Sequence, residues 1–312
     1  MFCAIRGGMT DLAILFEHPQ WFAPLFAALD ARGVAYRAIH ADGFAFDPAA
    51  ISAPARVVFN RIAMSSFLRA PEHPIFHAAA ALAHWQERGA RVLNGAGALA
   101  IDASKARQLS LIAGLGLAIP ATRVVHRAAD LSAAAAELRF PIVVKANIGG
   151  SGAGIVRYDD ADALALAVAG GTVPDSIDRV LLVQEYVPAR GGTITRIETL
   201  GGRFLYAIEV DGGGSFDLCP ADVCAVPGRP TITMTRVDPD PALIEAAEAI
   251  VQRAGIDVGG VEVLVDDRDG AARFYDINAL SNFVANPLEI LGWDPHARLV
   301  DWLADIIAET SK

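Results

Sequence analysis

The chain has 312 residues, of which 53% are hydrophobic, and a formal net charge of −10. Its length suffices for two or three domains with separate cores, and its negative charge argues against a nucleic-acid partner, which needs clustered lysine and arginine. No apolar run reaches the roughly 18 residues that span a membrane, and the N-terminus lacks the pattern of a signal peptide. We therefore expect a cytoplasmic protein without a membrane partner; whether Met1 or Met9 is the native start stays open.

The first hundred residues alternate short apolar runs with helical patterns. We predict strands at 12–16, 35–39, 55–59 and 91–93, and helices at 19–33 and 75–88. This alternation of strands and helices is typical of a parallel sheet with helices on its faces. Glycines at 94–97 indicate a boundary loop after it.

The remaining two thirds of the chain mix helices with hairpins. We predict helices at 102–113, 130–138, 159–168, 241–254 and 295–307, and strands at 120–125, 141–146, 155–158, 180–187, 194–200, 203–210, 258–265 and 272–277. Gly201 and Gly202 separate two of these strands, as in a β-hairpin. The fold class is thus α/β, with two α+β units after the parallel sheet.

The most informative segment is a glycine-rich loop at 149–154, which contains four glycines among six residues. Without Cβ atoms, backbone N–H groups can approach an anion closely. No Gly-Lys-Ser/Thr closes the loop, and a second short strand follows it instead of a helix, so neither a P-loop nor a dinucleotide fingerprint fits. We predict a hairpin flap over phosphates; an ordinary surface hairpin is the alternative.

Lysine is rare in this chain, because only Lys105, Lys145 and Lys312 occur. Lys145 directly precedes the glycine loop and can balance phosphate charge. Far downstream, Glu262, Asp276 and Asn278 offer the carboxylate and amide oxygens that magnesium prefers. Asp276 and Asn278 alternate along a predicted strand, which puts both side chains on one face. Together these features predict a site for ATP and Mg²⁺ or Mn²⁺, the alternative being strand-edge acids and solvated lysines.

Over residues 100–282 the order and spacing of these motifs resemble the ATP-grasp superfamily, in particular its RimK-like, glutamate-adding ligases. The resemblance implies a pre-ATP-grasp domain at 1–98, a first ATP-grasp subdomain with the flap at 99–183, and a second with the metal site at 184–312. It also implies nucleotide contacts from both internal lysines, the flap and a hinge strand, and these residues are Lys105, Lys145, Gly150, Ser151, Gly152, Gly154, Gln184, Glu185, Tyr186 and Val187.

The resemblance further implies the remaining roles in the site. Glu262, Asp276 and Asn278 match the metal ligands, and the backbone of Glu185 and Val187 matches the groups that receive adenine. Arg196 matches a basic residue that faces the transferred phosphate, so Arg196 and Lys145 are the expected catalytic residues.

Three positions depart from the pattern of that family. Ile194 stands where the family usually has an acid, and Asp276 replaces the usual glutamate of the metal pair. Residues 279–283, Ala-Leu-Ser-Asn-Phe, replace the usual Pro-Gly after Asn278. The last change borders the expected acceptor site, so substrate identity does not carry over.

The chemistry that the resemblance implies is carboxylate–amine ligation through an acylphosphate, with release of ADP and phosphate. The expected partners are a small carboxylic acid and an amine, such as an amino acid or a short peptide, and a homo-oligomer stays open. An ATP-dependent small-molecule kinase and a nucleotide-binding scaffold without turnover are the alternatives. The three cysteines and seven histidines fit neither a disulfide framework nor a zinc site.

Two residues are candidates for selecting the acid. Arg61 follows the third predicted strand, at the sheet edge where ligands of such folds commonly bind. It could hold a substrate carboxylate or be a satisfied loop arginine. Asn282 lies in the unusual segment after the metal residues. We predict that both select the acid and that glutamate is not the preferred substrate.

Overall fold

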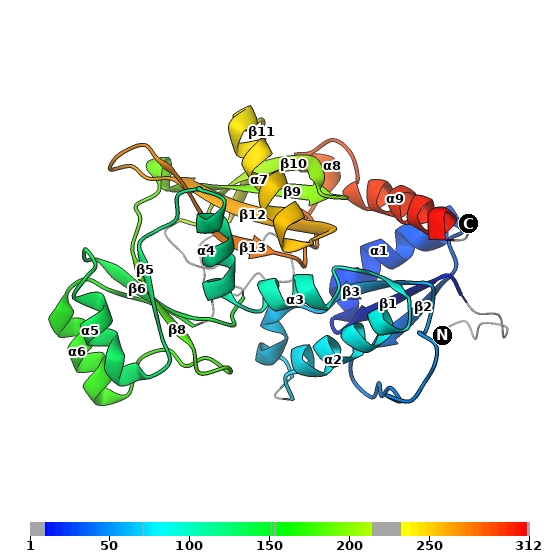
Figure 1. Cartoon of the computed structure of the whole chain (residues 1–312). Coiled ribbons are helices and arrows are strands. Elements are labelled where there is room, and N and C mark those ends of the chain that lie inside the picture. Colours follow the sequence, from blue (N-terminus) through cyan, green and yellow to red (C-terminus); the bar gives the residue numbers. More distant parts are fainter. Residues whose placement is uncertain (1–9, 71, 151, 153, 214–231, 311–312) are drawn as a thin grey trace.

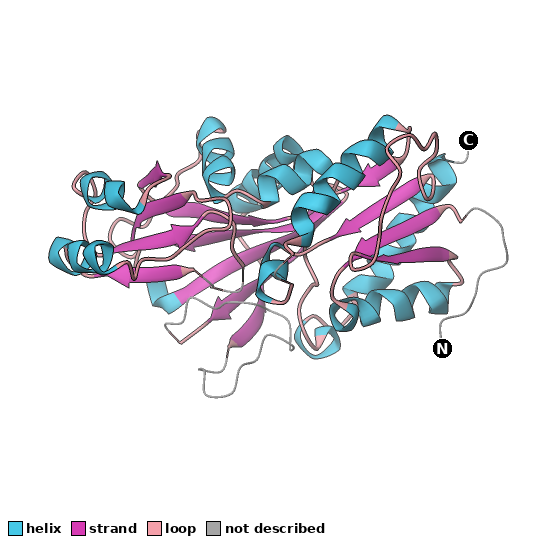
Figure 2. Cartoon of the chain, turned by 90° about the horizontal axis from the view of Figure 1, so that it is seen from below, coloured by secondary structure: helices cyan, strands magenta, loops and turns pink. Residues whose placement is uncertain are grey.

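The computed structural model describes residues 10–70, 72–150, 152, 154–213 and 232–310. Three sheets follow one another along the long axis of the molecule, with helices on their outer faces (Figure 1, Figure 2). Within the described ranges, no helix is long and apolar enough to cross a membrane.

The N-terminal sheet is parallel, as predicted, with strand order β2-β1-β3-β4. Its strands are β1 (Leu12–Phe16), β2 (Tyr36–His40), β3 (Val57–Arg61) and β4 (Arg91–Leu93), and its helices are α1 (Pro19–Arg32) and α2 (Pro74–Glu87). Leu12 and Ile14 of β1 pack with α1, whereas the alternating Ala13 and Leu15 pack with α2. Successive residues point to opposite faces, so helices cover the sheet on both sides.

The second sheet in sequence order lies at the end of the molecule away from the N-terminal sheet (Figure 1). It has strand order β5-β8-β6-β7, and its neighbouring strands are antiparallel. Its elements are β5 (Thr122–Val125), η2 (Ala128–Asp130), α5 (Leu131–Ala135), β6 (Ile142–Ala146), β7 (Ile155–Tyr158), α6 (Ala161–Gly170) and β8 (Leu181–Glu185). The pairing of Lys145 with Ile155 confirms that the glycine loop joins two strands of a hairpin.

The C-terminal sheet has strand order β11-β10-β9-β12-β13. It comprises η3 (Arg190–Gly192), β9 (Thr193–Leu200), β10 (Arg203–Asp211), β11 (Thr233–Val237), α7 (Pro241–Ala254), β12 (Val258–Val265) and β13 (Ala272–Asn278). The predicted hairpin around Gly201 and Gly202 is present as β9 and β10, and β12 and β13 also pair antiparallel. Helix α3 (Ala96–Asp102) leads from the N-terminal sheet to α4 (Lys105–Gly114), which packs on β13.

The chain then returns to the N-terminal sheet through α8 (Pro287–Ile290) and α9 (Pro295–Thr310). Leu299 and Leu303 of α9 share one core with Leu25 of α1 and with β1. The last helix therefore ties the two ends of the chain together by apolar burial.

Some boundaries differ from the prediction. Arg61 is the last residue of β3 and does not follow it. The helix predicted from 102 begins at Lys105, because Ser104 caps it by accepting from the Arg107 N–H, and Asp102 ends α3, which was not predicted. The prediction missed β11. The domain boundary predicted between 183 and 184 falls inside β8, which pairs with β5 and β6; we propose to place it after this strand.

Candidate functional site

A cavity of about 570 Å³ is lined by residues of the sheet β5-β8-β6-β7, of the C-terminal sheet, and of α1 and the turn after β3 in the N-terminal unit. Its walls include most of the predicted nucleotide, metal and substrate residues, namely Lys105, Lys145, Gly150, Gly152, Gln184, Glu185, Tyr186, Val187, Arg196, Glu262, Asp276, Asn278 and Asn282. Gly154 and Arg61 do not line it, and Ser151 lies outside the described residues.

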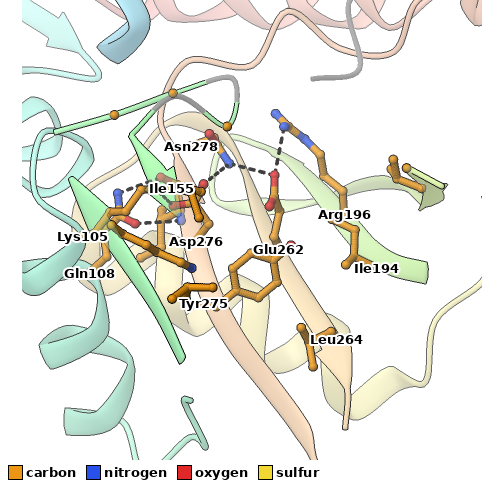
Figure 3. Close-up of a pocket in the computed structure, with 18 of the residues that line it drawn as sticks. Lys105, Gln108, Ile155, Ile194, Arg196, Glu262, Leu264, Tyr275, Asp276 and Asn278 are labelled. Atoms are coloured by element: carbon orange, nitrogen blue, oxygen red, sulfur yellow. Dashed lines mark hydrogen bonds and ion pairs between the residues drawn. The ribbon is translucent and has the colours of Figure 1, made fainter. Parts of the chain in front are cut away.

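The three predicted metal residues converge because of the register between β12 and β13. Glu262 pairs with Asp276 across the two strands, and Asn278 lies two residues further on. The Asn278 side-chain N–H group donates to Glu262 Oε1 at 3.3 Å and to Asp276 Oδ2 at 3.4 Å (Figure 3). Burial, reinforced by the charge of Asp276, raises the pKa of Glu262. Two buried carboxylates so close to each other favour a bound cation.

The three predicted metal ligands, Glu262, Asp276 and Asn278, would all bind an ion through oxygen atoms. In the described part of the chain, no three His, Cys, Asp or Glu side chains gather where they could hold a metal ion. The set here consists of two carboxylates and one amide, which can turn its oxygen toward them. Oxygen ligands of this kind fit Mg²⁺, which binds through one or two carboxylates and completes its shell with water and phosphate.

Lys105 begins α4 and pairs with the Asp276 carboxylate (Figure 3). Burial alone would favour the neutral amine, but the charges of Asp276 and Glu262 raise the pKa of Lys105. Lys145 projects from β6 and lies with its ammonium 5.5 Å from the centre of the Tyr275 ring. Burial lowers the pKa of Lys145 to about 8, and the nearby charge of Lys105 adds to this. Two cations thus border the acidic pair.

Arg196 is held between two carboxylates. Its Nε donates to Glu198 Oε1 at 2.6 Å, and its Nη1 donates to Glu262 Oε1 at 3.3 Å. Burial opposes its charge, yet Glu198 and Glu262 raise the pKa of Arg196, so the guanidinium stays ionised. Because β9 and β12 pair Arg196 with Glu262, strand register sets this contact.

The glycine loop passes close to the N-terminal unit. A Cβ atom on Gly150 would lie 3.0 Å from the Cβ of Ser65 and 3.2 Å from its backbone nitrogen. Gly154 has a φ of +72° and leaves no room for a side chain beside Ala146. Gly154 therefore requires glycine, and at Gly150 a side chain would have to displace Ser65. The loop thus adjoins the turn η1 (Met64–Leu68) that follows β3.

The end of β8 presents backbone groups to the cavity. The N–H of Glu185 donates to Ala121 and that of Tyr186 donates to Pro141, both at 2.9 Å. Among the described residues, no backbone partner is recorded for the next N–H, that of Val187. Ile194 also lines the cavity, so an apolar side chain occupies the position of the expected acid.

Arg61 lies behind the cavity wall. It is only 2% exposed, its Nη2 donates to the Ser281 carbonyl, and its guanidinium lies 4.9 Å from the Phe59 ring centre. Burial lowers the pKa of Arg61 to about 9. Asn282, by contrast, lines the cavity.

Several buried polar residues that support the site were not predicted. Asn94 donates from Nδ2 to the carbonyls of Val258 at 2.6 Å and Ala279 at 2.5 Å. Asp102 accepts from the Ala279 N–H, and Gln108 exchanges two hydrogen bonds with the backbone of Ile277. In the sequence, Asn94 stands in a glycine-rich turn, and Asp102 and Gln108 are polar residues beside apolar helix positions. Both patterns are too common to be specific.

Comparisons with known proteins agree with this geometry. Residues 102–217 match the model of the RimK-like ATP-grasp domain. The chain is 29% identical over 138 residues to a probable alpha-L-glutamate ligase of Thioalkalivibrio sulfidiphilus, which covers 43% of this chain and 44% of that protein. It is 28% identical over 232 residues to the ribosomal protein bS6–L-glutamate ligase of Salmonella paratyphi B, which covers 73% and 72%.

Among solved structures, the ATP-grasp ligase PsnB complexed with minimal precursor, Mg and ADP superposes with a TM-score of 0.68. The sequences are 16% identical, and the match covers 99% of this chain and 100% of the other. The structural likeness supports the ATP-grasp fold, and the match of residues 102–217 supports a likeness to the narrower RimK-like group. The chain has the fold of the ATP-grasp ligases, and its residues 102–217 match a RimK-like ATP-grasp domain.

Proposed function

We propose that this chain is an ATP-dependent carboxylate–amine ligase, which forms an amide bond through an acylphosphate and releases ADP and phosphate. The observation that carries the proposal is the convergence of three cations, Lys105, Lys145 and Arg196, on the Glu262–Asp276 pair within one cavity. Neither cysteine nor histidine is among the described residues that line it. Charge stabilisation and positioning suit phosphoryl transfer, which needs no covalent nucleophile.

In this proposal the hinge at 184–187 receives the adenine through the carbonyl of Glu185 and the N–H of Val187. Lys105, Lys145 and the glycine loop hold the phosphates. Lysine suits this role because it is a compact cation on a flexible stem. The short distance between the loop and Ser65 supports a phosphate lid that closes against the N-terminal unit.

Glu262, Asp276 and Asn278 would hold Mg²⁺, or Mn²⁺, with carboxylate and amide oxygens. When bound, the ion neutralises phosphate charge. Lys105 must then exchange its contact with Asp276 for one with the nucleotide. Arg196, kept ionised by Glu198, stabilises the negative charge of the transferred phosphate beside the attacking carboxylate.

The proposed substrates are a carboxylic acid and an amine of the amino-acid or short-peptide class. Relatives are named as glutamate ligases, one of them acting on ribosomal protein bS6. The segment at 279–283 departs from the glutamate-adding pattern, so we expect a different acid here. We propose that Asn282 contacts this acid directly and that Arg61 acts on it through the carbonyl of Ser281.

The test is a screen of amino acids and dipeptides for ADP release with Mg·ATP, each with and without hydroxylamine as a general amine. A ligase releases ADP in an acid-dependent way and yields a hydroxamate. A stable phosphorylated acid without hydroxamate identifies a kinase. ATP binding without ADP release for any acid identifies a scaffold. Asp276→Ala should abolish turnover while the protein stays folded.

A further inference from the structure

Helix α4 begins with Lys105 and lies beside β13, the strand of the metal residues (Figure 1, Figure 3). Gln108, one turn further along the helix, is buried. Its Nε2 donates to the Ile277 carbonyl at 2.9 Å, and its Oε1 accepts from the Ile277 N–H at 3.1 Å. Ile277 stands between Asp276 and Asn278. These two hydrogen bonds therefore fix the helix, and Lys105 with it, on the metal side of the cavity.

The N-terminus of α4 is held from the other side, by the residue that follows β6. A helix leaves its first N–H groups without partners inside the helix. Ser104 supplies one partner, because its Oγ accepts from the Arg107 N–H at 3.3 Å. Asn147 supplies two more: its carbonyl accepts from the Lys105 N–H at 3.2 Å, and its side-chain Oδ1 accepts from the Ala106 N–H at 2.9 Å. A residue distant in the sequence thus caps this helix.

Asn147 is itself held in one orientation. It is buried, its Nδ2 donates to Asp178 Oδ2 at 2.6 Å, and its N–H donates to the Val180 carbonyl at 3.1 Å. The other oxygen of Asp178 accepts from the Ser176 hydroxyl at 2.6 Å and from the Val180 N–H at 3.1 Å. The amide of Asn147 therefore has its oxygen toward α4 and its nitrogen toward Asp178.

Asn147 also lies between two parts of the expected phosphate site. It follows Lys145 by two residues and precedes the glycine loop at 149–154 by two. The N–H of the next residue, Ile148, donates to Ser176 Oγ at 3.3 Å, so the base of the loop is anchored to the segment that holds Asn147. Lys105 and Lys145 both line the cavity, and Asn147 is hydrogen-bonded to the backbone of the first and is close in sequence to the second.

We propose that Asn147 is a positioning residue for binding of the nucleotide phosphates: by capping α4 it fixes Lys105 relative to Lys145, and Asp178 holds its amide in the required orientation. The inference rests on the proposed function, in which both lysines hold the phosphates. Asn147 does not line the cavity, so it acts through the lysines and not by contact with the nucleotide. Charge-assisted hydrogen bonds are short and directional, and they weaken when either partner shifts.

The test measures nucleotide binding and needs no acid substrate. Asn147→Leu nearly keeps the size of the side chain but removes the acceptor for the Ala106 N–H. In MgCl₂, calorimetry gives the Kd for ATP, and competition with ATP gives that for adenosine. We expect the Kd for ATP to rise about tenfold and that for adenosine to change less than about twofold, because adenosine has no phosphate. A residue that only stabilised the fold would not produce this difference.

A second pair of variants tests the role of Asp178. Asn147→Asp keeps the oxygen that caps α4 but places a carboxylate against that of Asp178, so the Kd for ATP should rise. Adding Asp178→Asn restores one donor and one acceptor with the two side chains exchanged, and it returns the net charge to that of the wild type. The double variant should bind ATP within about threefold of the wild type. These variants provide the comparison if Asn147→Leu does not fold.

Asp160→Ala is the matched control, because Asp160 caps α6 by accepting from the Ala163 N–H at 2.8 Å and lies outside the cavity. It should lower the melting temperature and leave the Kd for ATP unchanged. An unchanged Kd for ATP in Asn147→Leu overturns the proposal, as does an equal loss for ATP and adenosine, or a double variant no better than Asn147→Asp. If the wild type does not bind ATP, the proposed function fails, and this inference fails with it.

Discussion

The pair between Lys105 and Asp276 allows a test that needs no knowledge of the substrate. Lys105 compensates the acidic pair of Glu262 and Asp276, and the two paired side chains are only 15% and 17% exposed. Lys105→Met keeps the stem and the helix propensity but leaves two carboxylates without this cation. In metal-free buffer the variant should therefore be less stable than the wild type.

The magnitude follows from the burial of the pair. Removing one partner of a buried ion pair costs about 3–5 kcal/mol, and partial exposure places this case near 3 kcal/mol. At about 2 °C per kcal/mol for a chain of this size, the melting temperature should fall by roughly 6 °C. Magnesium supplies the missing positive charge, and at 100 times its Kd a ligand stabilises the folded state by about 2.7 kcal/mol.

The assay is thermal melting with EDTA, with MgCl₂ and with KCl at matched ionic strength. We expect Mg²⁺ to stabilise Lys105→Met far more than the wild type, because the lysine no longer competes for Asp276. Arg107→Met, an exposed position in the same helix, is the control and should respond as the wild type does. Equal melting temperatures in EDTA, or equal gains with Mg²⁺, would refute the reasoning.

Three further outcomes follow from the same site. Lys145→Met should weaken ATP binding roughly ten- to a hundred-fold through one lost charge-assisted contact, and an unchanged affinity in a fluorescent-nucleotide titration would remove Lys145 from the phosphate site. Glu198→Ala should lower kcat far more than it changes the KM for ATP, because Arg196 loses its 2.6 Å partner. Glu198→Gln should recover most of the lost kcat. Steady-state kinetics in which both variants behave alike would contradict the role of Glu198 in positioning Arg196. Burial raises the pKa of Asp102 to about 7, so the folded state binds more protons than the unfolded chain between about pH 4 and 7. In EDTA the free energy of unfolding should therefore fall as pH rises through that window. Asp102→Asn should flatten this slope, and identical slopes for the variant and the wild type in denaturant titrations would disprove the role of Asp102.

Much of the fold could be predicted because local patterns encode it. The alternation of apolar strands and helices fixed the parallel sheet, and the helix at 241–254 has the predicted bounds because Asp240 caps it and Gly255 ends it. Strand β11 was missed because most of its side chains are exposed or half-buried, so it lacks the apolar run of the inner strands. Its pairing with β10 depends on backbone hydrogen bonds more than on side-chain pattern.

Site residues could be predicted where their spacing along one strand indicates them, and could not be predicted where segments distant in the sequence meet. Alternation along β13 gave Asp276 and Asn278, whereas Asn94 bonds to Asp257, Val258 and Ala279, which are 163–185 residues away. A glycine-rich turn indicated only a loop there. Likewise, nothing local distinguishes Glu198 from a surface acid, because its burial comes from the strands on both sides of β9.

The central claim is that a substrate carboxylate attacks ATP and that an amine then displaces phosphate. The most direct measurement uses the acid selected by the screen with ¹⁸O in its carboxylate, together with Mg·ATP and an amine, and follows the label by mass spectrometry. The account predicts one ¹⁸O atom in each released phosphate and one amide for each ADP. Phosphate without ¹⁸O would show that water, and not the carboxylate, receives the phosphoryl group, and would contradict the account.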